Sequence, residues 1–511
     1  MEMYDKIVES NKKFWSKENE RSEKNGVLIY ECFYSIPQMC YGISKVALCI
    51  AKSLNLKPMV LLPWRRSLLT ESMCDTHLQM KNSLLSIIID NLFFLTSIFF
   101  INKHKLLDLK ICDVKVGTYI YDSILRRYNK KTINRLSLRE RSFVCLEMCY
   151  FFYFKKVLTK YEVKAVVLGD NVYRYGLIFG LCKENGIPCF TPVDLNSLFI
   201  KKYSNKSNYD NAFLTQDILK QQCAGVDFKK IIDDYYIKRY EGNIIQHDVL
   251  TAYANKLTSS HDEFYNKYCL DKNKKTVVVM CHVFADAPHV YLKTLYDDYW
   301  DWFVRTLSCL LENKQVNVLV KEHPSSHLYG QKGIVSDYLK ENGYGNLQIS
   351  ETESTLSVIR NADIVVTCGG TIGLEFSYAK KRVVLASRPP YGELGFTEVF
   401  ESRLEYEEFL KSHIQELEEL PLDKHRIALQ ASYVSFCCQN NWSKKLELGG
   451  DIILLNGTYD DNKLWTKIQQ YNQVPLKEQE IFKLLNNFIK SGDIALFNGN
   501  TNIELLTKNV D

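Results

Sequence analysis

Several motifs that would assign a function at a glance are absent from this sequence of 511 residues. Its 16 cysteines form no C-x-x-C pair and show no cysteine–histidine spacing typical of zinc sites, which predicts reduced thiols in a cytoplasmic protein. The N-terminus is polar and lacks the apolar core of a signal peptide, so secretion is not expected. No D-x-D pair occurs, so a metal ion bridging a diphosphate would have no evident ligands, and we expect a site without metal.

The charge balance argues against one large class of partners. A formal net charge of +5 is too small to indicate nucleic-acid binding, although it suits anionic substrates or an anionic membrane surface. With 46% hydrophobic and 24% charged residues, the composition is that of a folded globular protein. The length predicts two or three domains.

One apolar segment, residues 83–101, approaches the length of about 20 residues that spans a bilayer. Asp90 lies near its centre, where a charge would be costly in hydrocarbon, and no second segment of this kind exists. We therefore expect a buried or interface-lying helix rather than a span. Contact with the inner face of the cytoplasmic membrane stays open.

Strands and helices alternate in two parts of the chain. Apolar runs followed by helical patterns predict β-α-β units within 27–62 and 163–191. A second series has strands expected at 276–280, 316–320, 347–349, 363–367 and 382–386, and helices at 291–313, 354–361 and 371–380. The pattern predicts an α/β fold of GT-B type, with two Rossmann-like doubly wound domains facing a cleft. The expected domains are 1–260 and 270–400, followed by a helical C-terminal extension over 401–511.

The first candidate phosphate site is the K-E-H-P segment, which directly follows the strand expected at 316–320. Open α/β sheets bind ligands at the carboxyl ends of their strands. Pro324 fixes the turn, His323 can donate to a phosphate oxygen or protonate a leaving group, and Lys321 adds positive charge. The alternative is a histidine that merely caps the turn.

The second candidate is the C-G-G-T-I-G-L-E segment after the strand at 363–367. Gly369 and Gly370 let the backbone approach a ligand, and Thr371 is placed to cap the helix that carries Glu375. Free N–H groups at such a helix start bind anions, and Glu375 would reach ribose hydroxyls. The alternative is a tight turn that only packs a helix on the sheet.

Catalytic candidates come from other strand ends. C-H-V-F-A-D-A-P-H places His282 and Asp286 after the strand at 276–280, and Asp170 follows the strand near 163. Each can act as a base or bind acceptor hydroxyls, while helix capping is the alternative for both aspartates. Asp122 and Arg126 are further polar residues expected to face the same cleft.

These motifs resemble a family. K-E-H-P-S-S and A-D-I-V-V-T-C-G-G-T-I-G-L-E resemble the bacterial surface-polysaccharide glycosyltransferases of GT-B fold, in particular the capsule-biosynthesis group. C-H-V-F-A-D-A-P-H and G-D-N-V-Y-R-Y-G resemble the same group. The H-P pair is also similar to that of bacterial sialyltransferases, which contact the phosphate of CMP with it, and of glycerophosphotransferases in teichoic-acid synthesis. The resemblance implies that His323 holds donor phosphate, that the Gly369–Thr371 turn holds phosphate or ribose, and that Glu375 binds ribose.

We therefore expect a glycosyltransferase that moves a sugar from a nucleotide-sugar donor to a growing capsule or lipopolysaccharide, with no cofactor beyond the donor. The acceptor would be a glycan or a lipid-linked glycan. A CMP-activated donor is one option, but the D/E-D/E-G motif of sialyltransferases is missing before H-P. A nucleotide-sugar epimerase of the same fold and a non-catalytic glycan-binding or assembly protein are the two alternatives.

Overall fold

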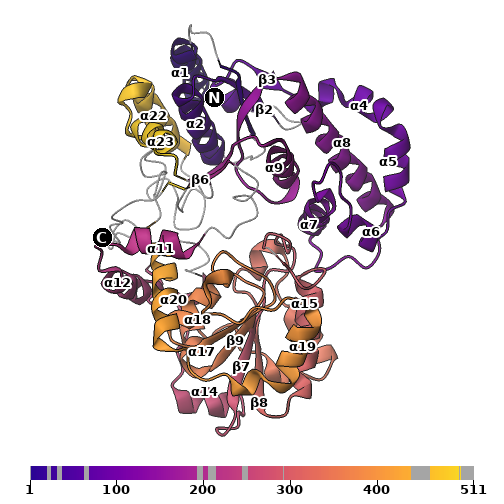
Figure 1. Ribbon diagram of the computed structural model, residues 1–511, viewed down its shortest axis with the longest axis vertical. Coiled ribbons are helices and arrows are strands. Elements are labelled where there is room, and N and C mark those ends of the chain that lie inside the picture. The colour runs from indigo at the N-terminus through magenta and orange to yellow at the C-terminus, as the bar shows by residue number, and fades with distance from the viewer. Residues whose placement is uncertain are drawn as a thin grey trace. The chain divides into compact units, whose positions relative to one another are not determined.

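The computed structural model (Figure 1) describes residues 2–19, 25–31, 37–62, 68–192, 200–204, 214–243, 251–291, 293–438, 461–493 and 495–496. The chain divides into two compact units. The first unit contains Met1–Ile120, Arg135–Tyr209 and Gln439–Asn498, and the second contains Tyr121–Asn134, Asp210–Cys438 and Gly499–Asp511. Each unit is built on its own sheet.

The first unit has a six-stranded sheet in the order β3-β2-β1-β4-β5-β6. Its strands are β1 (Val27–Glu31), β2 (Lys57–Leu61), β3 (His77–Leu78), β4 (Val163–Val167), β5 (Cys189–Pro192) and β6 (Ile200–Tyr203). All neighbours pair in parallel except β6, which is antiparallel to β5. The two predicted β-α-β units are confirmed, and the second contains α9 (Tyr173–Asn185), which ends at Gly186 in the left-handed conformation.

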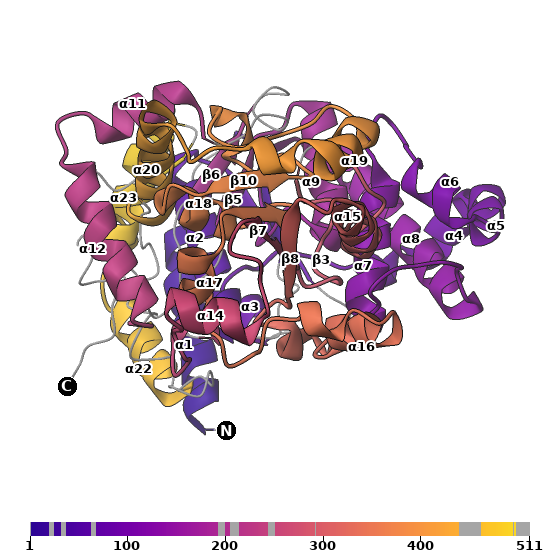
Figure 2. The ribbon, with the colours of Figure 1, turned by 90° about the horizontal axis from the view of Figure 1, so that it is seen from below.

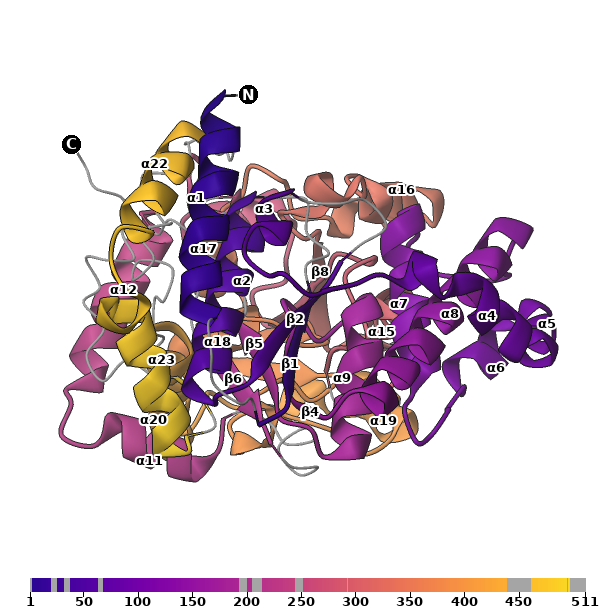
Figure 3. The same cartoon turned by 90° about the horizontal axis from the view of Figure 1, so that it is seen from above.

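Helices from both ends of the chain cover one face of this sheet. They are α1 (Glu2–Asn19), α2 (Pro37–Ser53), α22 (Asp461–Tyr471) and α23 (Glu480–Ser491), and their apolar side chains share one core with the strands (Figure 3). α8 (Leu138–Lys160) packs on α9, and α3 (Leu68–Glu71) packs on α2. The C-terminal helices were expected in a separate extension. Instead their buried faces, including Leu464 and Leu485, complete the core of the first unit.

The single helix expected over 83–101 is wrong. The segment forms two short helices, α4 (Leu84–Asp90) and α5 (Leu92–Phe99), which pack on α8 and are followed by α6 (Lys103–Leu107). Asn91 ends one helix and begins the next, and its side-chain amide donates to the Ile87 carbonyl at 2.8 Å, a local bond that competes with helix continuation. In the described part of the chain, no helix combines the length and the apolar character needed to cross a bilayer.

The second unit has a four-stranded, entirely parallel sheet in the order β10-β9-β7-β8. The strands are β7 (Lys275–Met280), β8 (Val316–Lys321), β9 (Ile364–Thr367) and β10 (Arg382–Leu385). The strand expected at 347–349 is wrong, because a 3-10 turn, η3 (Gly345–Leu347), occupies its start and only Gln348 pairs with Val320. Two Rossmann-like α/β units followed by a largely helical tail confirm the predicted fold class, while the cleft stays a prediction.

Helices cover both faces of this sheet (Figure 2). α15 (Tyr299–Glu312) and α19 (Arg403–Ser412) lie on one face, and α14 (His261–Lys267), α17 (Thr355–Asn361) and α18 (Ile372–Tyr378) lie on the other. α16 (Ile334–Glu341) follows a short 3-10 turn, η2 (Ser326–Tyr329). The predicted helix 291–313 starts late, since Asp298 caps α15 by accepting from the Asp301 N–H at 2.8 Å.

The second unit also takes in residues that were expected in the first domain, 1–260. α11 (Gln216–Cys223) and α12 (Phe228–Tyr240) pack on α20 (Leu422–Phe436). The physical reason is aromatic: Tyr236 stacks on Tyr378 with ring centroids 3.9 Å apart, and Tyr235 stacks on Phe436. α7 (Val116–Tyr128) is divided, so that its part from Tyr121 onward belongs to the second unit.

Candidate functional site

Three of the predicted clusters meet at one edge of the second sheet. β7 lies between β9 and β8, so the segment after β7, which begins at Cys281, has the Gly-Gly turn on one side and K-E-H-P on the other. All three strands are parallel, and their carboxyl ends therefore lie at the same edge. The prediction that K-E-H-P and the Gly-Gly turn share a sheet edge is confirmed.

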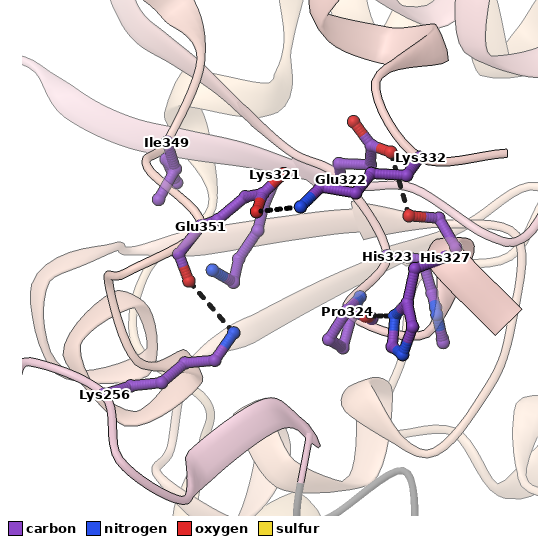
Figure 4. A pocket seen from close by; sticks show the side chains of 10 residues that line it. Lys256, Lys321, Glu322, His323, Pro324, His327, Lys332, Ile349 and Glu351 are labelled. Atoms are coloured by element: carbon purple, nitrogen blue, oxygen red, sulfur yellow. Dashed lines mark hydrogen bonds and ion pairs between the residues drawn. The ribbon is translucent and has the colours of Figure 1, made fainter.

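A pocket opens at the end of β8 (Figure 4). The side chains that line it come from β8, η2 and two more distant loops, and they are Lys256, Lys321, Glu322, His323, Pro324, Ser326, His327, Lys332, Ile349 and Glu351. Three lysines and two histidines make the pocket basic. Glu351 partly offsets the charge of the outer lysines: its carboxylate pairs with Lys332 at 3.0 Å, and its carbonyl accepts from Lys256 at 3.0 Å. The arrangement suits a phosphate group.

Lys321 is the most deeply placed cation of the pocket. Its side chain is buried, and Nζ donates to the Glu353 carbonyl at 2.9 Å. Burial, together with nearby Lys256, lowers the pKa of Lys321 to about 7. An anion bound here would restore its charge.

His323 is held in a defined orientation by its own turn. The Ser325 N–H donates to its Nδ1 at 3.1 Å, so the neutral ring carries its proton on Nε2. Glu322 beside it serves the loop rather than the pocket, since it accepts from the Gly333 N–H at 2.8 Å and from the Ser326 hydroxyl at 2.9 Å. The turn-capping alternative therefore describes Nδ1, while Nε2 is a donor of the kind a phosphate oxygen accepts.

His282 connects the two halves of this edge. Its Nε2 accepts from the Gly369 N–H at 3.2 Å, and its ring stacks on Tyr299 with centroids 4.3 Å apart. Burial, and to a lesser degree the neighbouring His323, lower the pKa of His282 to about 3. A ring that stays neutral and already accepts a bond is a weak base. Its geometry suits positioning the Gly-Gly turn.

The Gly-Gly turn disfavours a side chain at either glycine, through backbone conformation at one and lack of space at the other. Gly370 has φ of 82°, and a Cβ at Gly369 would lie 2.5 Å from the Tyr291 ring. The predicted cap at Thr371 is wrong: Thr371 occupies the N-cap position of α18, but its exposed side chain makes no capping bond. Thr371 has helical backbone angles, with φ of −68° and ψ of −21°. A capping residue instead has an extended backbone, which brings its hydroxyl to the N–H groups of the first turn.

Glu375 is engaged inside the second unit. Its carboxylate accepts from Arg239 at 2.7 Å and from the Tyr253 hydroxyl, and the Glu375 and Arg239 side chains are each 3% exposed. A carboxylate bound in this way is a structural ion pair in the present conformation. Removing it would leave a buried guanidinium without its counter-charge, which costs about 3–5 kcal/mol.

The two candidate aspartates lie in different units. Asp286 is exposed and accepts from the Tyr329 hydroxyl at 3.2 Å, in the unit that carries the pocket. It does not cap α15, so that alternative is wrong. Asp170 lies at the end of β4 in the first unit and accepts from the Asn171 N–H at 2.7 Å, while α9 is capped at Val172.

Several polar contacts of this edge were missed by sequence reasoning. Lys256, Lys332 and Glu351 line the pocket from loops that carry no motif. Asp122 and the C-H-V-F-A-D-A-P-H segment that ends at His289 were both singled out, but the contact between Asp122 and His289 was not expected. Arg126 lies over the Tyr329 ring at 3.9 Å. Within the described ranges, no three or more His, Cys, Asp or Glu side chains are grouped to hold a metal ion.

We predict that replacing His282 with glutamine makes the protein less sensitive to acid. The pKa of His282 is lowered to about 3 on folding, so the unfolded chain binds a proton first and stability falls as the pH drops below 6.5. Between pH 7 and pH 5 the wild type should lose about 2 kcal/mol more than His282→Gln, whose amide oxygen still accepts the Gly369 N–H. Urea unfolding at both pH values measures this, and equal losses in the two proteins would contradict it.

The chain is similar to one protein family in sequence and to several solved structures. Residues 190–408 match the family model described as "Capsule polysaccharide biosynthesis protein". No curated protein matches the sequence. Among solved structures, the KpsC β-Kdo 2,7 transferase of Thermosulfurimonas dismutans is 12% identical, covering 68% of this chain and 95% of its own, with a TM-score of 0.31.

Two other solved structures cover more of the chain. S. aureus MnaA, solved with UDP, is 11% identical and covers 84% of this chain and 98% of its own, with a TM-score of 0.25. A variant of the wall teichoic acid polymerase TagF is 11% identical and covers 93% and 94%, with a TM-score of 0.24. At these scores the structural matches assign no function. The resemblance to the capsule-biosynthesis group is confirmed by the family match, which spans the pocket and the Gly-Gly turn of the second unit.

Proposed function

We propose that the protein is a glycosyltransferase of capsule or lipopolysaccharide biosynthesis, acting in the cytoplasm on a nucleotide-sugar donor. The observation that carries the proposal is the basic pocket at the carboxyl end of β8, next to the Gly-Gly turn and within the segment that matches the capsule family. A donor diphosphate is the ligand that several cations and a nearby glycine turn would bind together. A growing surface glycan, free or lipid-linked, would accept the sugar.

The roles follow from the geometry of the second unit. Lys321 would gain its full charge against the donor phosphate, and the Nε2–H of His323 would donate to a phosphate oxygen. Gly369 and Gly370 would let the backbone approach the donor, and Thr371 would offer its backbone N–H group. His282 would hold the turn in place, because it accepts from the Gly369 N–H. Because these groups neutralise a phosphate by themselves, the proposal needs no metal ion.

Other assignments are finer and rest on the resemblance. A CMP-activated sugar is one candidate donor, and UDP-, GDP- and CDP-activated forms are the others. Asp286 and Asp170 are the exposed or half-buried carboxylates proposed to contact the acceptor. Ribose binding by Glu375 would require its carboxylate to exchange Arg239 for the sugar hydroxyls.

We predict that His323→Ala weakens nucleotide binding roughly 10- to 100-fold, since it removes a hydrogen bond to a charged phosphate. The measurement is calorimetry with CMP, UDP, GDP and CDP-glycerol on the purified protein. His413→Ala is the matched control, because His413 is exposed and bonds only to Glu416 at 3.2 Å.

Equal affinities of the His323 and His413 variants would remove the donor site from this pocket. Conversion of a bound nucleotide sugar to its epimer, without any acceptor, would favour the epimerase alternative over transfer. Normal surface glycan in cells that carry a folded His323→Ala protein would favour a non-catalytic role.

We also propose that α4 and α5 touch an anionic membrane surface. Five large apolar side chains in and directly after this pair are 57–88% exposed. They are Leu85, Ile89, Leu92 and Phe93 within the helices, and Phe100 directly after α5. Exposed Lys81 and Lys105 flank them in sequence. Helices of seven and eight residues are too short to span a bilayer, but such an apolar pair with basic neighbours suits the headgroup region.

We predict that changing Leu92 and Phe93 to serine lowers binding to vesicles of phosphatidylglycerol and phosphatidylcholine at least about tenfold, because each buried side chain contributes about 1.5–3 kcal/mol. Cosedimentation measures the bound fraction. The matched control changes Leu404 and Leu422, both 75% exposed in the second unit, and should bind like the wild type. If the wild type does not bind the vesicles, the membrane proposal is wrong, and the transferase proposal is unaffected.

A further inference from the structure

A buried histidine–aspartate pair lies in the second unit, and no role in the proposed donor site has yet been given to it. His289 Nδ1 lies 2.6 Å from Asp122 Oδ1, and the His289 backbone N–H donates to Asp122 Oδ2 at 3.2 Å. Both carboxylate oxygens therefore accept from one residue. The Asp122 side chain is 2% exposed. Because Nδ1 donates, the neutral ring has its lone pair on Nε2.

The neighbouring contacts hold the pair rigidly. The Tyr121 ring meets the His289 ring edge-on at 5.6 Å, and the Tyr121 hydroxyl donates to Asp298 at 2.5 Å. Thr132 donates to the same Asp298 oxygen at 2.6 Å. These bonds dock residues 121–134 on the start of α15, so the carboxylate is fixed before any ligand arrives.

The opposite nitrogen of the ring is open. Among the described residues, none forms a hydrogen bond with His289 Nε2. This nitrogen is also absent from the fully buried polar atoms that lack a partner, so it is not fully buried. The side chain is 14% exposed. A fixed imidazole with one nitrogen on a buried carboxylate and the other open is the arrangement of a general base.

The electrostatics of the pair agree with this geometry. Burial lowers the pKa of His289, but the charge and hydrogen bond of Asp122, with Asp298 and Asp297 nearby, outweigh it and raise the net pKa. Burial raises the pKa of Asp122, while His289 opposes that rise. An imidazolium formed at His289 would thus meet a carboxylate already in place.

The pair lies close to the donor half-site of the same unit. Tyr299 stacks on His282 at 4.3 Å. Asp298, the residue before Tyr299, accepts from the hydroxyl of Tyr121, the residue before Asp122, so residues 298–299 contact both clusters. His289 also ends the C-H-V-F-A-D-A-P-H segment that starts at the sheet edge. Donor and base would then belong to one rigid unit.

We propose that His289 is the catalytic base of sugar transfer and that Asp122 is its positioning residue; this inference rests on the proposed function. His289 Nε2 takes the proton of the acceptor hydroxyl as its oxygen bonds to the anomeric carbon. The bond from that carbon to the donor phosphate breaks, and its electron pair leaves with the nucleotide. The imidazolium is stabilised by Asp122 until it returns the proton to water.

The test compares three variants in nucleotide release. The donor is a sugar activated with the nucleotide that binds tightest in the calorimetric panel, and membranes from glycan-producing cells supply the acceptor. His289→Asn keeps an amide N–H for Asp122 but has no outward nitrogen. Asp122→Asn removes the charge. Tyr121→Phe, the matched control, removes the hydroxyl that donates to Asp298 and accepts from the Ile133 N–H, and leaves both members of the pair unchanged.

The expected result is a loss of roughly 100-fold or more in rate for His289→Asn, with donor affinity and melting temperature near those of the wild type. Tyr121→Phe should keep its rate within about twofold while losing some stability. In Asp122→Asn the acid limb of the rate profile should move to lower pH, because the pKa of His289 falls without the carboxylate.

Wild-type rates in a folded His289→Asn would overturn the proposal, as would an unmoved acid limb in Asp122→Asn. Equal loss of rate and stability in His289→Asn and Tyr121→Phe would make the pair an anchor and overturn it too. A wild type that binds no nucleotide, or binds one without turnover, would instead contradict the proposed function and with it the base.

Discussion

Parallel pairing of β9, β7 and β8 is the constraint on which the site depends. It brings three loops, far apart in sequence, to one edge of the second sheet. The bond from the Gly369 N–H to His282 Nε2 then fixes two of these loops against each other, and His323 follows on the third. Without the central position of β7, the basic pocket and the Gly-Gly turn would be separate features. With it, they lie at one sheet edge, as the proposed half-site for an anionic donor requires.

The charges at this edge are placed so that a ligand can change them. Lys321 is buried with a pKa near 7, and Lys256 and Lys332 are both held by Glu351. This arrangement limits the cost of placing three lysines together, because one of them can lose its proton. Lys332 pairs with the Glu351 carboxylate, and Lys256 donates to the Glu351 carbonyl. A bound phosphate would favour the protonated form of Lys321 and would compete with Glu351 for the other two lysines.

Sequence patterns predicted most of the fold because runs of β-branched residues, such as 275–280 and 364–367, have one meaning in an α/β chain. They failed where a local side-chain bond decided the outcome, as at Asn91, or where a turn replaced a strand, as at 345–347. The motifs of K-E-H-P and the Gly-Gly turn were readable. The ion pair of Arg239 with Glu375 and the contact of His289 with Asp122 were not, since each joins residues more than one hundred positions apart.

The central claim, that Lys321 and its neighbours bind donor phosphate, has a direct thermodynamic test. At pH 8 Lys321 is mostly neutral. An anion that binds beside it should raise its pKa, so that Lys321 takes up a proton on binding. Calorimetric titration with the best-bound nucleotide sugar, in two buffers of different ionisation enthalpy, counts the protons taken up. The account predicts about one proton per nucleotide in the wild type and close to none in Lys321→Met. Tight binding without proton uptake by the wild type would contradict it.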